Sequence, residues 1–146
     1  MLSAFTAPEV GELAGVTYRQ LDHWVRQGWI VPSVNAAIGR GARRLFSPDD
    51  VVRGAALGRV GRARMDLAGY GPLIAGLDLT AIATQVIVAV QDPFGFETID
   101  RNRVIAVLGE RGPCVVYDPA PTLARLNPIA TTRSSGVGPV RLRTVS

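Results

Sequence analysis

The chain contains no lysine, so arginine supplies all 16 of its basic residues. Every cation is therefore a planar guanidinium that can donate two parallel hydrogen bonds to one phosphate or base. The arginines are unevenly placed: residues 1–64 hold nine against five acids, residues 65–126 hold four against seven, and the rest hold three against none. Basic charge at both ends favours a nucleic-acid-binding head joined to a module with another role.

Cysteine and histidine are nearly absent, since Cys114 and His23 each occur once. A single cysteine excludes an internal disulfide and a metal site built on a cysteine pair, and His23 has no second imidazole beside it. Cys114 stands in an apolar run, so we expect a small hydrophobic side chain rather than a reactive thiol. No paired acids and no nucleophile with a partner are visible, and we predict a protein that is not an enzyme and binds no cofactor.

Long apolar runs are also missing. None approaches the roughly 20 residues that a membrane-spanning helix needs. The N-terminus shows no secretory pattern, and we expect a cytoplasmic protein. A hydrophobic content of 47% is enough for a packed core over the 146 residues, which make one moderate domain or two small ones.

The most strongly marked segment is a short helix predicted between Thr17 and Gly28. Thr17 and Gln20 have the spacing of a capping box, in which each side chain satisfies a backbone N–H group of the other residue. Gly28 supplies the left-handed residue that ends a helix. The apolar face consists of residues at helical spacing, which are Leu21, Trp24 and Val25.

A capped helix precedes this segment and another follows it. Thr6 and Glu9 form a second capping box, and Gly15 ends that helix. Two helices joined by a tight turn predict a helix-turn-helix, whose second helix is presented to DNA. A third helix is predicted from Ser47, its N-cap, to about Arg64.

A wing is predicted between the second and third helices. Residues 29–32 are a short apolar segment, and a loose, glycine-containing loop separates them from Arg43-Arg44-Leu45-Phe46. Two short strands around such a loop favour a hairpin. Three arginines flank it, namely Arg40, Arg43 and Arg44.

The segment from Phe5 to Arg53 resembles the winged-helix DNA-binding domain of the MerR family of bacterial transcription regulators. The matching segments are Thr6–Val16, Tyr18–Trp24, Arg26–Gly28 and Arg43–Val51. An actinobacterial variant of the family has the same Arg-Gln-Leu-Asp-aromatic-Trp pattern and a long wing. This chain departs from the family in two ways. It lacks the long helix that forms a dimeric coiled coil in many members, and it has Asp22 where relatives often carry an arginine.

The resemblance implies a sequence-specific transcription regulator, associated with the nucleoid, whose recognition helix enters the major groove. Arg19 suits a bidentate contact to guanine, while Tyr18 and the wing arginines suit phosphates or the minor groove. The residues expected at double-stranded DNA are Thr17, Tyr18, Arg19, His23, Arg40, Arg43 and Arg44. The alternative is that these arginines only keep the surface soluble.

Residues 65–126 predict a small module after the head, which makes the expected fold class α+β. A short helix, broken at residues 69–72, is followed by a β-branched run at 85–90 that predicts a buried strand, with a helix as the alternative. Whether a short return strand follows, up to Thr98, stays open. Asp100 is expected to cap a helix up to Arg111, with Gly112 as its stop.

A second strand at residues 114–117 and a last helix at 122–126 complete the module. Strand, helix and strand at this spacing suggest two neighbouring strands, and a parallel arrangement stays open. Residues 127–146 are rich in serine, threonine and glycine and predict a flexible basic tail.

The expected organisation is therefore a DNA-binding domain at 1–64, a dimerisation or partner-binding module at 65–126 and the tail. We expect a homodimer through residues 84–126, because one winged helix reads few base pairs and open strand edges pair readily. A monomer whose module packs on its own head is the alternative. Two other functions also stay open: an excisionase-like architectural protein, and a protein-interaction adaptor with weak DNA binding.

Overall fold

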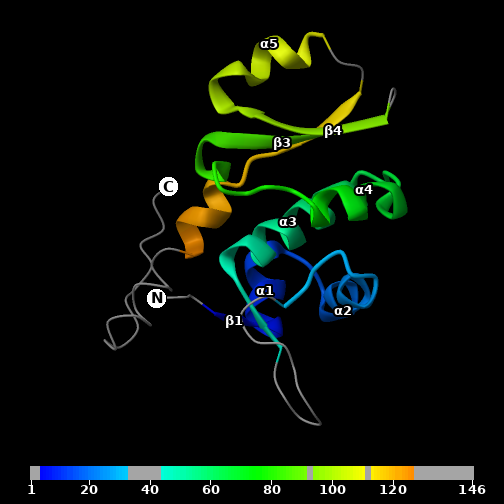
Figure 1. Cartoon of the computed structure of the whole chain (residues 1–146), viewed down its shortest axis with the longest axis vertical. Helices are drawn as coiled ribbons and strands as arrows, with labels where there is room; N and C mark the ends of the chain where they lie inside the picture. The colour runs from blue at the N-terminus through cyan, green and yellow to red at the C-terminus, as the bar shows by residue number, and fades with distance from the viewer. Residues whose placement is uncertain (1–3, 33–43, 92–93, 111–112, 127–146) are drawn as a thin grey trace.

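The computed structural model describes residues 4–32, 44–91, 94–110 and 113–126, and Figure 1 shows its path. The head contains β1 (Phe5–Thr6), α1 (Ala7–Ala14), α2 (Tyr18–Arg26), β2 (Leu45–Phe46), α3 (Pro48–Arg62) and α4 (Leu67–Ala75). The second half contains η1 (Ile82–Thr84), β3 (Gln85–Gln91), β4 (Phe94–Asp100), η2 (Arg101–Arg103), α5 (Val104–Leu108) and β5 (Cys114–Tyr117). Residues 120–126 are also helical.

The elements form three layers, which are the helices of the head, a three-stranded sheet and α5 (Figure 1). The expected α+β class is confirmed. α3 lies between the helix-turn-helix and the sheet, since it contacts α1 on one side and β5 on the other.

Three helices of the head begin at the predicted caps. Thr6 with Glu9, Thr17 with Gln20 and Ser47 with Asp50 each form a complete capping box. The left-handed glycines expected after the first two helices are present at Gly15 and Gly28, with φ of 72° and 78°. These caps are local in sequence, which is why they can be predicted without the tertiary structure.

The predicted wing hairpin is wrong in its described part. Residues 29–32 form no strand, and β2 pairs instead with β1, with Phe5 opposite Phe46. The reason is that the amides of Trp29 and Ile30 both donate to the carbonyl of Trp24, and the Ile30 side chain is fully buried. The loop at residues 33–43, with the rest of the expected wing, lies outside the described residues.

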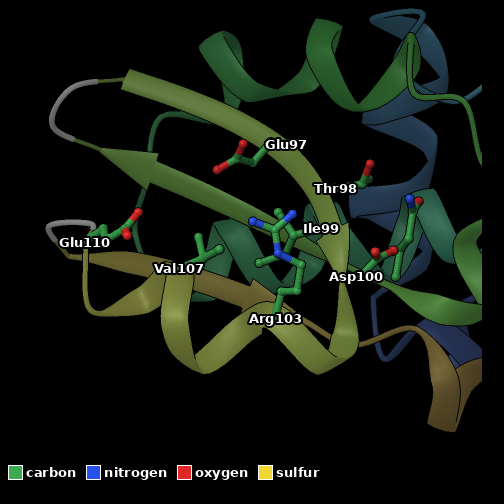
Figure 2. A pocket seen from close by; sticks show the side chains of 8 residues that line it. Glu97, Thr98, Ile99, Asp100, Arg103, Val107 and Glu110 are labelled. Carbon is green, nitrogen blue, oxygen red and sulfur yellow. The ribbon is translucent and has the colours of Figure 1, made fainter.

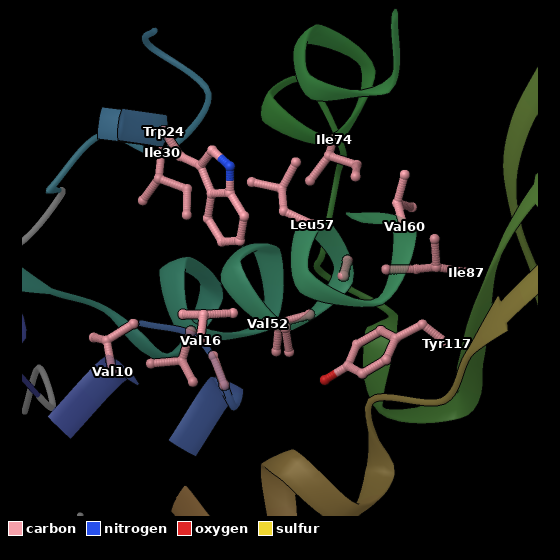
Figure 3. Close-up of a cluster of buried hydrophobic side chains, with 14 of the residues drawn as sticks. Val10, Val16, Trp24, Ile30, Val52, Leu57, Val60, Ile74, Ile87 and Tyr117 are labelled. Carbon is pink, nitrogen blue, oxygen red and sulfur yellow. The ribbon is translucent and has the colours of Figure 1, made fainter. Parts of the chain in front are cut away.

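One buried cluster runs from the head into the second half of the chain. It joins Val10 and Trp24 of the helix-turn-helix, through α3, to Ile87 of β3 and Tyr117 of β5 (Figure 3). Leu126, from the last helical segment, belongs to it too. The proposed boundary at residue 64 therefore falls within a shared core, and the division into two domains stays a prediction.

The sheet is antiparallel throughout, with the order β4-β3-β5, so the suggested parallel pairing is wrong. The return strand to Thr98 is present and longer than expected, as β4. Because β4 reverses the chain before α5, the helix connects β4 and β5, which run in the same direction on either side of β3. The predicted buried strand at 85–90 is confirmed as β3, whose alternate residues face the head and α5.

The helix expected up to Arg111 is shorter than predicted. Asp100 makes no capping bond through its side chain, and a turn of 3₁₀-helix, η2, precedes α5. Arg101 occupies this junction, because its guanidinium is bound to the Asp118 carboxylate and the Ala83 carbonyl. Gly109 follows α5 as its C-cap, and the expected stop at residue 112 lies outside the described residues.

α4 continues through residues 69–72, where the sequence predicts a break. Asp66 caps its N-terminus, and the Tyr70 hydroxyl donates a hydrogen bond to the Val90 carbonyl. The Trp29 indole lies against Gly71, where a Cβ atom would come within 2.3 Å of the ring. Tertiary contacts therefore hold a helix that its glycines and proline would weaken in isolation.

Substitution of Gly71 tests this contact. We expect Gly71→Ala to lower the free energy of unfolding by about 1–3 kcal/mol, because the Trp29 ring must move away from the new methyl group. Gly76→Ala is the matched control, since its Cβ would meet only ordinary contacts, the nearest at 3.7 Å. Denaturant unfolding of both variants measures the difference, and equal stabilities would contradict the packing argument.

A second prediction concerns Asp118, whose carboxylate lies 2.7 Å from Arg101 Nη2. The hydrogen bond from Arg101 lowers the pKa of Asp118, so its stabilising effect is present at neutral pH and lost as pH falls below about 4. We expect Asp118→Asn, which keeps an acceptor for the Ala120 amide, to melt below the wild type at pH 7. The two melting temperatures should converge in acid. Asp100→Asn is the control, and a gap independent of pH would refute the ion-pair explanation.

Candidate nucleic-acid interface

α2 presents a polar face that its buried side chains hold in place. Leu21 and Trp24 are 1% and 2% exposed and fix the helix to the core. Arg19, His23 and Arg26 are exposed at helical spacing along one stripe. At the helix start, the hydroxyl of the exposed Thr17 accepts a hydrogen bond from the backbone N–H of Gln20. The next residue, Tyr18, is 62% exposed.

Asp22 lies within this stripe and binds two arginines. Its Oδ1 accepts a hydrogen bond from Arg44 Nη1 at 2.8 Å, and its Oδ2 lies 3.0 Å from Arg26 Nη2. The hydrogen bond from Arg44 lowers the pKa of Asp22, and the charge of Arg26 acts in the same direction. The carboxylate is therefore ionised at neutral pH and compensated by two guanidinium groups.

Arg44 is the one predicted wing contact that the described residues include. It precedes β2 and is held against α2 by Asp22, although 22 residues separate the two in sequence. Arg40 and Arg43 lie outside the described residues. Thr17, Tyr18, Arg19, His23 and Arg44 thus all lie on α2, at its N-cap or bound to it.

Arg19 differs from its neighbours. Within the described ranges it makes no hydrogen bond or ion pair, whereas Arg26 and Arg44 share Asp22. The ring of His23 meets the ring of Trp29 edge to face, with centroids 6.0 Å apart. The His23 contact is thus with an aromatic side chain just after the helix, and His23 as a whole remains exposed.

Two contacts of this surface have no signal in the sequence. Asp22 is expected on the exposed face of the helix, but its pairing with Arg44 is not, because the two residues are far apart in sequence. Arg62, at the end of α3, donates to the Gly15 carbonyl at 3.3 Å in the turn of the helix-turn-helix. That contact joins positions 47 residues apart, which no spacing rule covers.

Comparison with known proteins agrees with this geometry. The family model for the MerR HTH family of regulatory proteins matches residues 5–55, which span β1 to the middle of α3. Residues 5–55 thus form a helix-turn-helix domain similar to that of the MerR family. An uncharacterised HTH-type transcriptional regulator of Mycobacterium bovis is 43% identical over 51 residues, which are 35% of this chain and 23% of that protein. Regulators from two strains of Mycobacterium tuberculosis match to the same extent.

The chain thus covers about a quarter of the length of these relatives. The sheet and α5 lie beyond residues 5–55, which the family model matches.

The second half contains an open groove between β4 and the α5 segment, with a volume of about 420 Å³ (Figure 2). Its charged lining residues are Glu97, Asp100, Arg103 and Glu110. Three carboxylates against one guanidinium make this surface unsuitable for a phosphate backbone. The α2 face, with Arg19, Arg26 and Arg44, is therefore the better candidate for nucleic acid.

Among the described residues, no group of three or more histidine, cysteine, aspartate or glutamate side chains is placed to hold a metal ion. The described helices include none with the length and apolar character to cross a membrane. Cys114 is half-buried and packs against Val86, Val88 and Val90.

Proposed function

We propose that this protein is a sequence-specific DNA-binding transcription regulator, with α2 in the major groove and Arg44 on the phosphate backbone. The carrying observation is the exposed basic stripe on a doubly capped helix of a MerR-family domain. A rigid helix of this size fits the major groove, and arginine is the side chain best suited to guanine there. The names of the Mycobacterium relatives support the same function.

The assignment of roles follows from the contacts. Arg19 makes no described contact and lies in the first turn of α2, which suits direct reading of a base. Tyr18 and Arg44 suit phosphates, since Tyr18 is exposed beside the helix start and Arg44 is already bound on one side. Nothing in this assignment calls for catalysis or a cofactor.

An excisionase-like architectural protein and a protein-interaction adaptor remain as alternatives. An adaptor would show no salt-dependent binding to genomic DNA fragments, whereas either DNA-binding protein would. Mapping bound sites across the genome separates the remaining two, because a regulator occupies discrete positions at promoters and an architectural protein assembles along extended tracts.

Replacing Arg19 tests the base-reading role. We expect Arg19→Ala to weaken binding to a selected operator by about 1–3 kcal/mol and to relax the preference at one base position. Binding to duplexes of random sequence should change far less. Selection of DNA sequences from a randomised pool with the wild type and with Arg19→Ala measures the base preference. Gln20→Ala is unsuitable as a control, because it would remove the capping box with Thr17 at the start of α2. If Arg19→Ala selects the same sequences with the same affinity, Arg19 does not read a base.

We also propose a homodimer through residues 84–126. Two heads are needed for useful specificity, and the chain lacks a coiled-coil stalk within its described residues. Ile105 on α5 is 84% exposed and Leu108 is partly exposed beside it, while β4 and β5 are the outer strands of the sheet. Exposed apolar groups and open edges of this kind favour pairing with a second copy.

Solution mass tests the dimer. Light scattering at micromolar concentration should give the mass of two chains, and Ile105→Asp should convert the dimer to a monomer. Leu73→Asp is the control, because Leu73 is an exposed leucine outside the proposed interface. Truncation is less suitable, since Ile87 and Tyr117 belong to the core of the head. A monomeric wild type would contradict the dimer and would mean that residues 84–126 only pack against the head of the same chain.

A further inference from the structure

The position of Asp22 raises a physical problem for a DNA-binding helix. A carboxylate on the face that approaches phosphates should weaken binding by repulsion. Asp22 nevertheless lies in the stripe that contains Arg19 and Arg26, and its side chain is 19% exposed. Its two oxygens are used by different arginines, one from the same helix and one from the segment before β2.

We infer that Asp22 is a positioning residue, whose carboxylate holds the Arg44 guanidinium beside the recognition helix so that Arg44 can bind a phosphate. This inference rests on the proposed function and deepens it. A guanidinium has five N–H donors, and the described contact uses Nη1. The side chain of Arg44 is 37% exposed, and its remaining donors make no other contact among the described residues.

Fixing Arg44 in advance has an energetic consequence. A free arginine loses rotamer freedom when it binds a phosphate, and an arginine already held in place loses less. Asp22 with its two arginines still carries a net positive charge, so the surface remains basic. The Asp22–Arg44 pair also fixes the distance between α2 and the start of β2, which sets the register of the two contacts on DNA.

The inference makes a prediction opposite in sign to that of simple charge counting. If Asp22 acts only as a negative charge, its removal should tighten binding to every DNA sequence. If it positions Arg44, its removal should weaken binding although the protein becomes more positive. It should also reduce the dependence on salt, because one phosphate contact is lost.

The experiment measures binding of the full chain to a fluorescein-labelled duplex of random sequence at several salt concentrations. We expect Asp22→Asn to weaken binding by about three- to tenfold and to reduce the slope of log K against log salt by up to about 1. Arg44→Ala should behave in the same way. The double variant should bind like Arg44→Ala alone, because the two residues act through one contact.

Two controls separate positioning from folding and from charge. Asp22→Ala favours the helix and should give the same result as Asp22→Asn, with melting temperatures close to that of the wild type, because the buried Leu21 and Trp24 still fix α2 to the core. Glu12→Gln removes an exposed acid of α1 and should leave binding equal or slightly tighter.

The outcomes distinguish this inference from the proposed function. A wild type without salt-dependent binding to the duplex refutes both. A wild type that binds, with an Asp22→Asn variant that binds equally or more tightly, refutes the positioning role alone. Losses that add in the double variant, or that follow a fall in melting temperature, also overturn it.

Discussion

The burial of α3 is the constraint on which the rest of the structure depends. Nine of its 15 residues are buried, because the helix-turn-helix covers one side of it and the sheet and α4 cover others. Small residues allow this close approach. A Cβ atom on Gly58 would lie 2.7 Å from a methyl group of Val16, whereas one on Gly54 would meet only ordinary contacts, the nearest at 3.6 Å from the Cβ of Ala14. The close approach of the helix-turn-helix therefore explains the glycine at position 58, although glycine weakens an isolated helix.

α4 links the end of α2 to the sheet. Gly71 receives the Trp29 indole from the end of α2, and Tyr70, its neighbour, packs on Phe94 with ring centroids 4.5 Å apart. Arg53 of α3 closes the other end of α4 through the carbonyls of Ile74 and Leu77. Short-range packing thus attaches the module directly to the head. In the proposed dimer, this packing would set the orientation of each α2 helix.

The features that could be predicted from the sequence are those determined within a few residues. The capping boxes at Thr6, Thr17 and Ser47 are of this kind, because both partners of each box lie three positions apart. The pairing of β1 with β2 and the contact of Asp22 with Arg44 were not predictable, since each depends on where the chain returns after a long loop. The sheet shows the same limit. Overlooking the full extent of β4 reverses the expected direction of β5, because one additional strand inverts the chain.

The arginines of the chain divide according to how their donors are used. Arg53, Arg62 and Arg125 donate to backbone carbonyls, and the Arg125 contact with Leu13 joins residues 112 positions apart. Such residues connect distant segments, because a guanidinium reaches several acceptors with one rigid group. Arg44 is intermediate, since Asp22 binds one side of it and the other donors remain available. Arg19, which has no partner among the described residues, keeps its full donor set for a ligand. In a chain without lysine, the contacts of each arginine therefore separate those that hold the fold together from those with donors left for a ligand.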